Sequence, residues 1–190
     1  MKVLIIPEDF RKDQYMLKPI FERLLRSIGD SSPKVRVCQD PLLGGDREAL
    51  KSERIAEVLS ANRGMYDVYV LCVDRDGQTG RRRRLDQIEA EFGTGRVFLA
   101  ENAWEEIETW VLAGLELPSD WRWAEVRAEV HVKEQYFEPL VAARGFVDSP
   151  GGGRRTLGDE ASRNISAIRQ KCPEDFDALA ERLETGIQAA

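Results

Sequence analysis

The chain has 190 residues, 42% of them hydrophobic and 33% charged, and a formal net charge of −6 at pH 7. This composition predicts one folded domain with a packed core and excludes an intrinsically disordered chain. The longest apolar run, residues 68–73, is far too short to cross a membrane, so we expect no membrane partner. The first hundred residues are nearly neutral, with 18 Lys and Arg against 16 Asp and Glu, whereas residues 101–190 have 10 against 18. The acidity is therefore uneven, and the position of the carboxylates is more informative than their sum.

Short apolar runs and helical periodicities alternate along the first hundred residues. The apolar runs predict four strands, at residues 2–7, 34–37, 67–73 and 96–100. Strands separated by helices of roughly 10–16 residues are joined by right-handed crossovers and form a parallel sheet. The run at 67–73 is the most apolar, so we expect it in the centre of the sheet, with the more polar 34–37 nearer an edge.

Helices are predicted between these strands and throughout the rest of the chain. Asp13 is the expected N-cap of the first helix, which ends at Gly29. Two loops are also expected, one with Pro41, Gly44 and Gly45 and an exposed one at residues 150–153. The predicted helices that follow the first one cover residues 47–62, 82–92, 103–115, 119–128, 131–143, 157–171 and 174–187.

Together these elements predict an α/β fold. It has a parallel four-stranded Rossmann-like sheet flanked by helices, followed by a C-terminal helical extension. We place the α/β core at residues 1–115 and the helical extension, packed on the core, at residues 116–190.

Cysteine and histidine exclude several kinds of site. The three cysteines, Cys38, Cys72 and Cys172, have no paired spacing, and no signal peptide is recognisable, so we expect free thiols and a cytoplasmic protein. His131 is the single histidine, which excludes a His-rich zinc site. Any metal is therefore expected to be a hard cation bound by carboxylates.

Acidic residues follow three of the four predicted strands. The first strand leads into Glu8, the central strand into Asp74 and Asp76, and the fourth into Glu101. In parallel α/β sheets the carboxyl ends of the strands meet at one edge, where ligands bind. Asp74 and Asp76 are two residues apart, so in extended backbone their side chains point the same way. Carboxylates gathered at one edge repel one another unless they titrate apart or bind a cation.

The segment after the fourth strand adds three more carboxylates. On a helix, Glu105 and Glu108 share a face, and Glu106 lies about 100° round from Glu105. Trp104 and Trp110 would help anchor that helix on the sheet. Solvated surface is the alternative interpretation of these acids, particularly for residues 105–108 taken alone.

These residues resemble a known family. The order of a strand and Glu8, then a strand and Asp74-x-Asp76-Gly77, resembles the TOPRIM domain of topoisomerases, primases and OLD-type nucleases. Residues 106–113, EIETWVLA, are similar to an E-I-E-x-W-L-L-A segment of small uncharacterised bacterial TOPRIM-like proteins, which are often suspected of roles in anti-phage defence. In TOPRIM domains a glycine usually follows the first-strand glutamate, whereas this chain has Asp9. No topoisomerase tyrosine domain or primase zinc module accompanies the core, so the resemblance implies a nuclease-like or regulatory protein.

The resemblance also implies roles for the acids. Asp74 and Asp76 would hold Mg²⁺ (or Mn²⁺), with Glu106 or Glu108 completing the coordination, and Glu8 would be a general base or a further ligand. The expected catalytic residues are therefore Glu8, Asp74 and Asp76, and the expected metal ligands are Glu8, Asp74, Asp76, Glu106 and Glu108.

Basic residues close to these acids suggest contact with phosphate. Four consecutive arginines follow Gly80, at the start of a helix, where positive charge opposes the helix dipole. Guanidinium groups match phosphate geometry, so an external anion would explain the run. A basic pair on the glycine-rich loop could close over a substrate, and a lysine in the extension is either near the site or a surface residue. The expected phosphate-binding residues are Arg81, Arg82, Arg83, Arg84, Arg154, Arg155 and Lys133.

The function predicted from these features is metal-dependent hydrolysis of phosphodiester bonds in DNA or RNA. The main alternative is a non-catalytic TOPRIM-like binding or regulatory module that docks on a partner ATPase or on nucleic acid. A receiver-like phosphoacceptor domain would also fit acids after the first and third strands, at Glu8, Asp9 and Asp74, but such a domain normally needs a lysine after a fifth strand.

Overall fold

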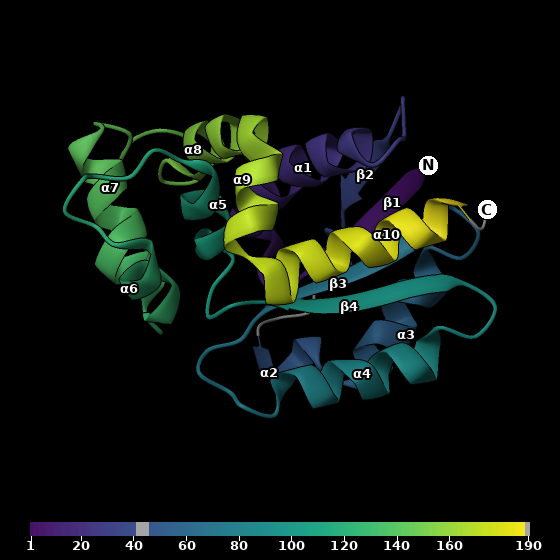
Figure 1. The fold of residues 1–190 in the computed structure, drawn as a ribbon. Coiled ribbons are helices and arrows are strands. Elements are labelled where there is room, and N and C mark those ends of the chain that lie inside the picture. Colours follow the sequence, from purple (N-terminus) through teal and green to yellow (C-terminus); the bar gives the residue numbers. More distant parts are fainter. Residues whose placement is uncertain (41–45, 189–190) are drawn as a thin grey trace.

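The computed structural model describes residues 1–40 and 46–188 of the chain. Its centre is a four-stranded parallel sheet in the order β2-β1-β3-β4 (Figure 1). The strands are β1 (Lys2–Pro7), β2 (Lys34–Val37), β3 (Val68–Asp74) and β4 (Val97–Ala103). The predicted α/β class, the parallel sheet, the interior place of the third strand and the edge place of the second are confirmed. The predicted loop with Pro41, Gly44 and Gly45 lies outside the described residues.

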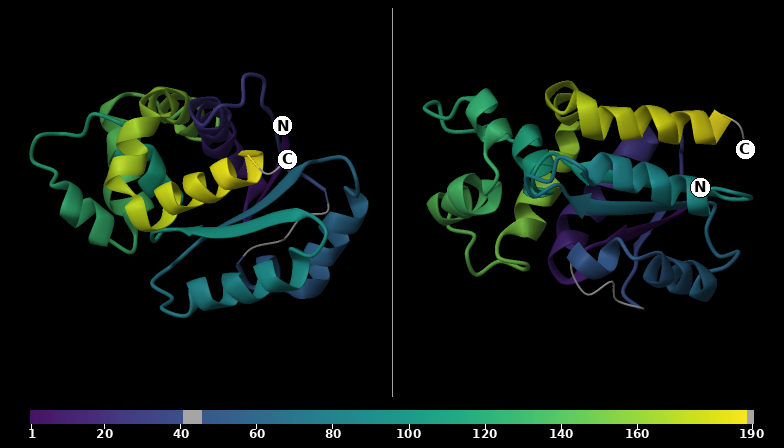
Figure 2. Two further views of the ribbon diagram at one scale, coloured as in Figure 1. Left: turned by 45° about the vertical axis from the view of Figure 1, so that its right-hand side comes forward. Right: turned by 90° about the horizontal axis from the view of Figure 1, so that it is seen from below.

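Helices cover both faces of the sheet (Figure 1 and Figure 2). On one face lie α1 (Phe10–Ser27) and α10 (Ala178–Gln188), and on the other α2 (Asp46–Ala49), α3 (Ser52–Ala61) and α4 (Arg81–Phe92). Alternate residues of β1 supply the two cores: Val3 and Ile5 join the cluster under α1, whereas Leu4 and Ile6 join the cluster under α3 and α4. A strand buried on both faces explains why β1 reads as a continuous apolar run.

The remaining helices gather at the carboxyl ends of the strands (Figure 1). They are α5 (Glu108–Gly114), α6 (Trp123–Ala128), α7 (Glu138–Ala143), α8 (Arg154–Ala161) and α9 (Ile165–Lys171), with short π and 3₁₀ turns at Lys133–Phe137, Ser162–Asn164 and Pro173–Asp177. Their apolar side chains belong to the same cluster as α1, and the rings of Trp110 and Phe176 meet edge to face at 5.2 Å. α8 crosses α1 closely, since a Cβ on Gly158 would lie 2.6 Å from the Tyr15 carbonyl oxygen.

Several predicted boundaries are wrong for local reasons. The first helix begins at Phe10 because Asp9, not Asp13, is its N-cap: an Asp9 carboxylate oxygen accepts a hydrogen bond from the Arg11 N–H at 3.0 Å. The fourth strand continues to Ala103, so Glu101 lies inside it and the next helix begins only at Glu108. The helix predicted at 47–62 is split into α2 and α3, and the one predicted at 157–171 begins at Arg154 and changes to a 3₁₀ turn after Ala161.

The three cysteines are buried, and none of them forms a disulfide. None of the helices in the described part of the chain combines the length and apolarity that a membrane crossing requires.

Side chains, not another strand, cover the outer edge of β4. The Ala100 N–H donates to Glu89 at 2.6 Å, and the Ala100 carbonyl accepts from Arg82 at 2.8 Å and Arg182 at 3.3 Å. The same two arginines hold the buried Glu101 at 2.8 and 2.6 Å. Burial raises the pKa of Glu101 to about 7 against the lowering effect of both arginines. This network links α4 and α10 across the edge strand β4, whose outward-facing backbone groups would otherwise lack hydrogen-bond partners.

We expect Arg182→Ala to lower the free energy of unfolding by about 2–3 kcal/mol, because the buried Glu101 loses one of its two counter-charges. Chemical denaturation measures this loss, and faster hydrogen exchange in β4 would locate it. Arg122→Ala is the matched control, because Arg122 is 81% exposed, and it should change stability by less than about 0.5 kcal/mol. An equal effect of the two substitutions would contradict a structural role for the network.

Candidate functional site

Four carboxylates converge at the carboxyl end of the sheet. Glu8 follows β1, Asp13 lies in the first turn of α1, Asp74 ends β3 and Glu108 begins α5. Electrostatic repulsion couples Asp13 and Asp74 to Glu8 and to Glu108, and Asp74 to Asp13. We call Glu8, Asp13, Asp74 and Glu108 the carboxylate cluster.

Two backbone contacts bring the members of the cluster together. The Asp9 N–H donates to the Asp13 carboxylate at 3.2 Å, which turns that side chain back toward the start of α1 and the end of β1. The Ile107 N–H donates to Asp74 Oδ1 at 2.8 Å and so fixes the loop after β4 against the end of β3. Because Ile107 directly precedes α5, the same contact places Glu108 beside Asp74.

Burial and mutual repulsion shift the protonation of the cluster. Burial first, and the nearby Glu108 second, raise the pKa of Asp13 to about 8. The same two causes hold the pKa of Asp74 well above its ordinary value. Partly buried acids that disfavour each other's ionisation reduce the stability of the fold, which is typical of functional sites.

Two basic residues of the helical extension reach the acids. Arg154 donates to Glu108 Oε1 from Nε at 3.1 Å and from Nη2 at 2.6 Å, and both side chains are buried. The Lys133 N–H donates to Glu106 at 2.5 Å, while the Lys133 ammonium lies 4.0 Å from Glu106 and 2.7 Å from Glu134. Burial raises the pKa of Glu106 to about 7. Arg154 and Lys133 therefore lie near the predicted acids, and each binds a carboxylate.

The predicted pairing of Asp74 with Asp76 is wrong. β3 ends at Asp74, and Asp76 adopts a φ of +52°, so the two residues do not share an extended backbone. The Asp76 side chain is 43% exposed and lies 3.6 Å from the Arg81 guanidinium. A turn, rather than a continued strand, separates Asp76 from the carboxylate cluster.

The predicted common face of Glu105 and Glu108 is also wrong. Glu105 precedes α5 and adopts a φ of +65°. Its carboxylate accepts hydrogen bonds from Arg75 and from the Gly77 N–H, each at 2.6 Å. Glu105 therefore braces the turn after β3 instead of joining Glu108.

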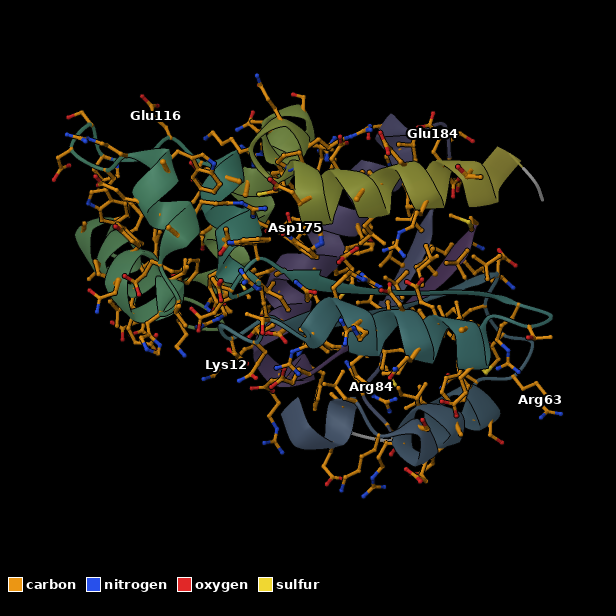
Figure 3. The ribbon with its side chains drawn as sticks, turned by 60° about the horizontal axis from the view of Figure 1, so that its bottom comes forward. Lys12, Arg63, Arg84, Glu116, Asp175 and Glu184 are labelled. Carbon is orange, nitrogen blue, oxygen red and sulfur yellow. The ribbon has the colours of Figure 1, made fainter. Side chains whose placement is uncertain are left out.

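The predicted arginine run does not face the site as a unit. Consecutive residues of a helix point about 100° apart, so four arginines spread around the axis of α4. Arg81 is buried beside Asp76, and Arg82 lies against β4. Arg84, labelled in Figure 3, donates to the Leu50 carbonyl at 2.7 Å. Arg83 is exposed, as is Arg155 on α8. Arg83 and Arg155 are the members of the predicted phosphate-binding set that face solvent most openly.

Sequence reasoning missed two acids. Asp13 was expected to be a helix cap, although its place four residues after Asp9 puts it back over the strand end. Asp175 supports the site from the far end of the chain: its carboxylate accepts from the Trp104 N–H at 2.8 Å and from Trp110 Nε1 at 2.7 Å (Figure 3). No local pattern relates Asp175 to residues about 70 positions earlier.

The chemistry of the cluster fits a hard divalent cation, since it offers carboxylate oxygens that repel one another when ionised. Within residues 1–40 and 46–188, no group of three or more Asp, Glu, His or Cys side chains is already arranged to hold a metal ion. Glu108 is held by Arg154, Glu106 by Lys133 and Glu105 by Arg75. Any cation would therefore be bound by a rearrangement of side chains within the cluster.

The raised pKa of Asp13 predicts a pH-dependent stability in metal-free buffer. The folded protein holds a proton on Asp13 that the unfolded chain releases near pH 3.8, so stability should fall as pH rises from about 4 to about 8. Asp13→Asn should remove part of this slope and stabilise the protein by roughly 2 kcal/mol above pH 8, with no gain near pH 4. Urea unfolding at both pH values tests this. Asp120→Asn, at an exposed position, should leave the slope unchanged, and parallel curves for Asp13→Asn and wild type would contradict the prediction.

Comparison of the chain with protein-family models, with curated proteins and with solved structures finds no match. A function for this protein has to be inferred from the chemistry of its own residues. Among the described residues, the carboxylate cluster is a group of acids whose desolvation and mutual repulsion raise the pKa of Asp13 and of Asp74.

Proposed function

We propose that this protein is a TOPRIM-like nuclease that hydrolyses phosphodiester bonds of DNA or RNA with Mg²⁺ (or Mn²⁺). The observation that carries the proposal is the carboxylate cluster, in which acids from β1, α1, β3 and α5 meet at the carboxyl end of a parallel sheet. Folding acts against the repulsion among these acids, and a bound cation would remove it. The sequence resemblance supports the same assignment and suggests a role in anti-phage defence, and the unpaired cysteines of the sequence suggest a cytoplasmic protein.

The residues of the proposed site would have different roles in the reaction. Glu8, Asp13 and Asp74 would supply oxygen ligands, and a bound Mg²⁺ would supply Lewis acidity and neutralise charge on the phosphate. Glu8, which follows β1, would either be one of these ligands or accept the proton of the attacking water. Arg83 and Arg155 are exposed and would contact the phosphate backbone of the substrate.

The direct test is incubation with single- and double-stranded DNA and RNA in Mg²⁺, in Mn²⁺ and in EDTA. Cleavage of at least one substrate in metal and none in EDTA is the expected result. Absence of cleavage for all substrates, together with no Mn²⁺ bound by the wild-type protein, would overturn the proposal. A parallel preparation with Asp74 replaced separates this activity from a contaminating nuclease.

The second candidate is a non-catalytic module that docks on a partner ATPase or on nucleic acid. The buried ion pair between Arg154 and Glu108 favours it, because the protein itself supplies a positive charge to the acids. Binding of nucleic acid without cleavage, unaffected by EDTA, would support this module over the nuclease. The receiver-like alternative has less support, because the sheet formed by the described residues has four strands and no fifth.

A further inference from the structure

We infer that the outer edge of β2 is a docking site for an extended, acidic segment of a partner protein, which adds to the sheet as a further strand. β2 is an edge strand, and the described residues that line the site include none of the acids of the carboxylate cluster. The inference therefore does not depend on the proposed function.

The backbone of β2 has hydrogen-bonding groups on its outer side. The Lys34 N–H donates to the Met1 carbonyl at 2.9 Å, toward β1. Because the N–H and C=O groups of successive residues in a strand point to opposite edges, those of Val35 and Val37 point away from β1. In the described part of the chain, no other strand pairs with β2 on that side.

The opposite edge of the same sheet is closed. There the Ala100 N–H and C=O are hydrogen-bonded to side chains of α4 and α10. No side chain of residues 1–40 and 46–188 makes an equivalent hydrogen bond to Val35 or Val37. An edge strand without such a cover is a template for pairing with another chain.

A groove with a volume of about 660 Å³ runs along the edge of β2. It is lined by residues 34–40, by Gln14 and Lys18 of α1, and by Asn62 and Tyr66, which follow α3. Because α1 and α3 cover opposite faces of the sheet, the groove spans the edge between them. An added strand in this groove would therefore contact side chains on both of its own faces as well as the β2 backbone.

The charge of the groove indicates the kind of partner. Lys18, Lys34 and Arg36 line it together with one acid, Asp40, although the whole chain has a formal net charge of −6. All three basic side chains are exposed, and none of them forms an ion pair with another described residue. Acidic side chains on the added strand would complement this charge and favour that partner over a basic one.

Two other occupants fit the edge less well. A second copy of the chain would pair β2 with β2, and the basic Lys34 and Arg36 of the two chains would then lie opposite one another, where like charges are destabilising. The phosphate groups of a nucleic acid offer acceptors only, which leaves the outward carbonyl groups of β2 without donors. A peptide backbone supplies both donors and acceptors.

Fluorescence anisotropy with short synthetic peptides tests the inference on the full-length protein. A peptide that alternates Glu and Val should bind roughly tenfold or more tightly than one that alternates Lys and Val. The double variant Lys34→Ala with Arg36→Ala should bind the acidic peptide roughly tenfold more weakly. Arg23→Ala with Arg26→Ala, which removes two exposed arginines of α1 outside the groove, is the matched control and should bind as the wild type does.

N-methylation of the acidic peptide tests the backbone contribution and leaves the protein unchanged. Methylation of all Glu amides and methylation of all Val amides block opposite edges of the peptide, so one of the two should weaken binding roughly tenfold or more and the other should not. Val37→Pro removes an outward N–H but keeps the pairing with β1, so it should weaken binding as well, whereas Val37→Ala should not. If Val37→Pro does not fold, the methylated peptides decide.

Four results would overturn the inference. These are no binding of the acidic peptide up to about 1 mM, equal losses in the two double variants, and unchanged binding of both methylated peptides. The fourth is binding of single-stranded DNA that is tighter than that of the peptide and is lost in Lys34→Ala with Arg36→Ala, which would assign the groove to nucleic acid. A wild-type dimer that Val37→Pro dissociates would likewise overturn it, because the edge would then belong to a second copy of the chain.

Discussion

Asp74→Asn is expected to reduce metal-dependent cleavage by roughly 1,000-fold or more and to weaken Mn²⁺ binding in parallel. Asp74 is the last residue of β3 and a central member of the carboxylate cluster, coupled to Glu108, Asp13 and Glu8. Asparagine keeps the Oδ1 atom that accepts the Ile107 N–H, so the loop after β4 should stay in place. The loss should therefore arise from the missing charge rather than from a local collapse.

The stability of the same variant separates this explanation from unfolding. Because the pKa of Asp74 is raised by burial and by its acidic neighbours, Asp74→Asn should be at least as stable as the wild type in EDTA near pH 8. Asp76→Asn is the matched control, since Asp76 is 43% exposed and lies outside the cluster, and we expect it to lose less than about tenfold in rate. Equal losses for the two variants would show that the site includes the turn after β3, as the sequence pattern indicated.

Asp175→Ala is expected to lower the free energy of unfolding by about 3–5 kcal/mol. The Asp175 carboxylate is 2% exposed and accepts hydrogen bonds from the Trp104 N–H, from Trp110 Nε1 and from Arg127. Its removal leaves the guanidinium of Arg127, which lies 5.2 Å from the Trp104 ring, with only the exposed Glu174 as a counter-charge. Denaturation with urea measures the loss.

Two further substitutions serve as controls for Asp175→Ala, one at a nearby acid and one that keeps the hydrogen-bond acceptor. Asp177→Ala removes an ion pair with Arg169 whose side chains are both 29% exposed, and it should cost less than about 1 kcal/mol. Asp175→Asn keeps the acceptor for the two tryptophan N–H groups and should be intermediate. Because Trp104 starts the loop that leads to Glu108, Asp175→Ala should also weaken Mn²⁺ binding. A stability change below 1 kcal/mol would contradict the role of Asp175 as the link between the C-terminal segment and the site.

The sheet was predictable because its signals are local. Strands covered on both faces read as apolar runs, as in β1 and β3, and the helices between them leave a parallel arrangement as the natural solution. The boundaries were less predictable because local capping and strand pairing decide them, which apolar patterns do not show. Asp9 caps α1 in place of Asp13, and pairing with β3 extends β4 to Ala103.

The acids were predictable as a group, but not one by one. Glu8 follows β1 and Asp74 ends β3, and parallel strands bring their carboxyl ends together whatever the details of the loops. Asp76 and Glu105 were misplaced because both lie in tight turns with positive φ, which spacing rules for strands and helices do not describe. Asp13 was taken for a cap, and its role depends on the chain turning back over the end of β1.

The sequence alone therefore determined the parallel α/β core and the gathering of acids at one edge. Apolar runs identify the buried strands, and the helices between them imply that the strands run in the same direction. The tertiary structure decided which acids meet, since Asp13 comes near Asp74 through the packing of α1 on the sheet, and Glu108 through the hydrogen bond from the Ile107 N–H to Asp74. It also decided that Arg154 neutralises Glu108, an ion pair between residues 46 positions apart. The uneven acidity of the chain, near-neutral in its first hundred residues and acidic beyond, becomes chemically meaningful only where folding brings carboxylates from both halves together.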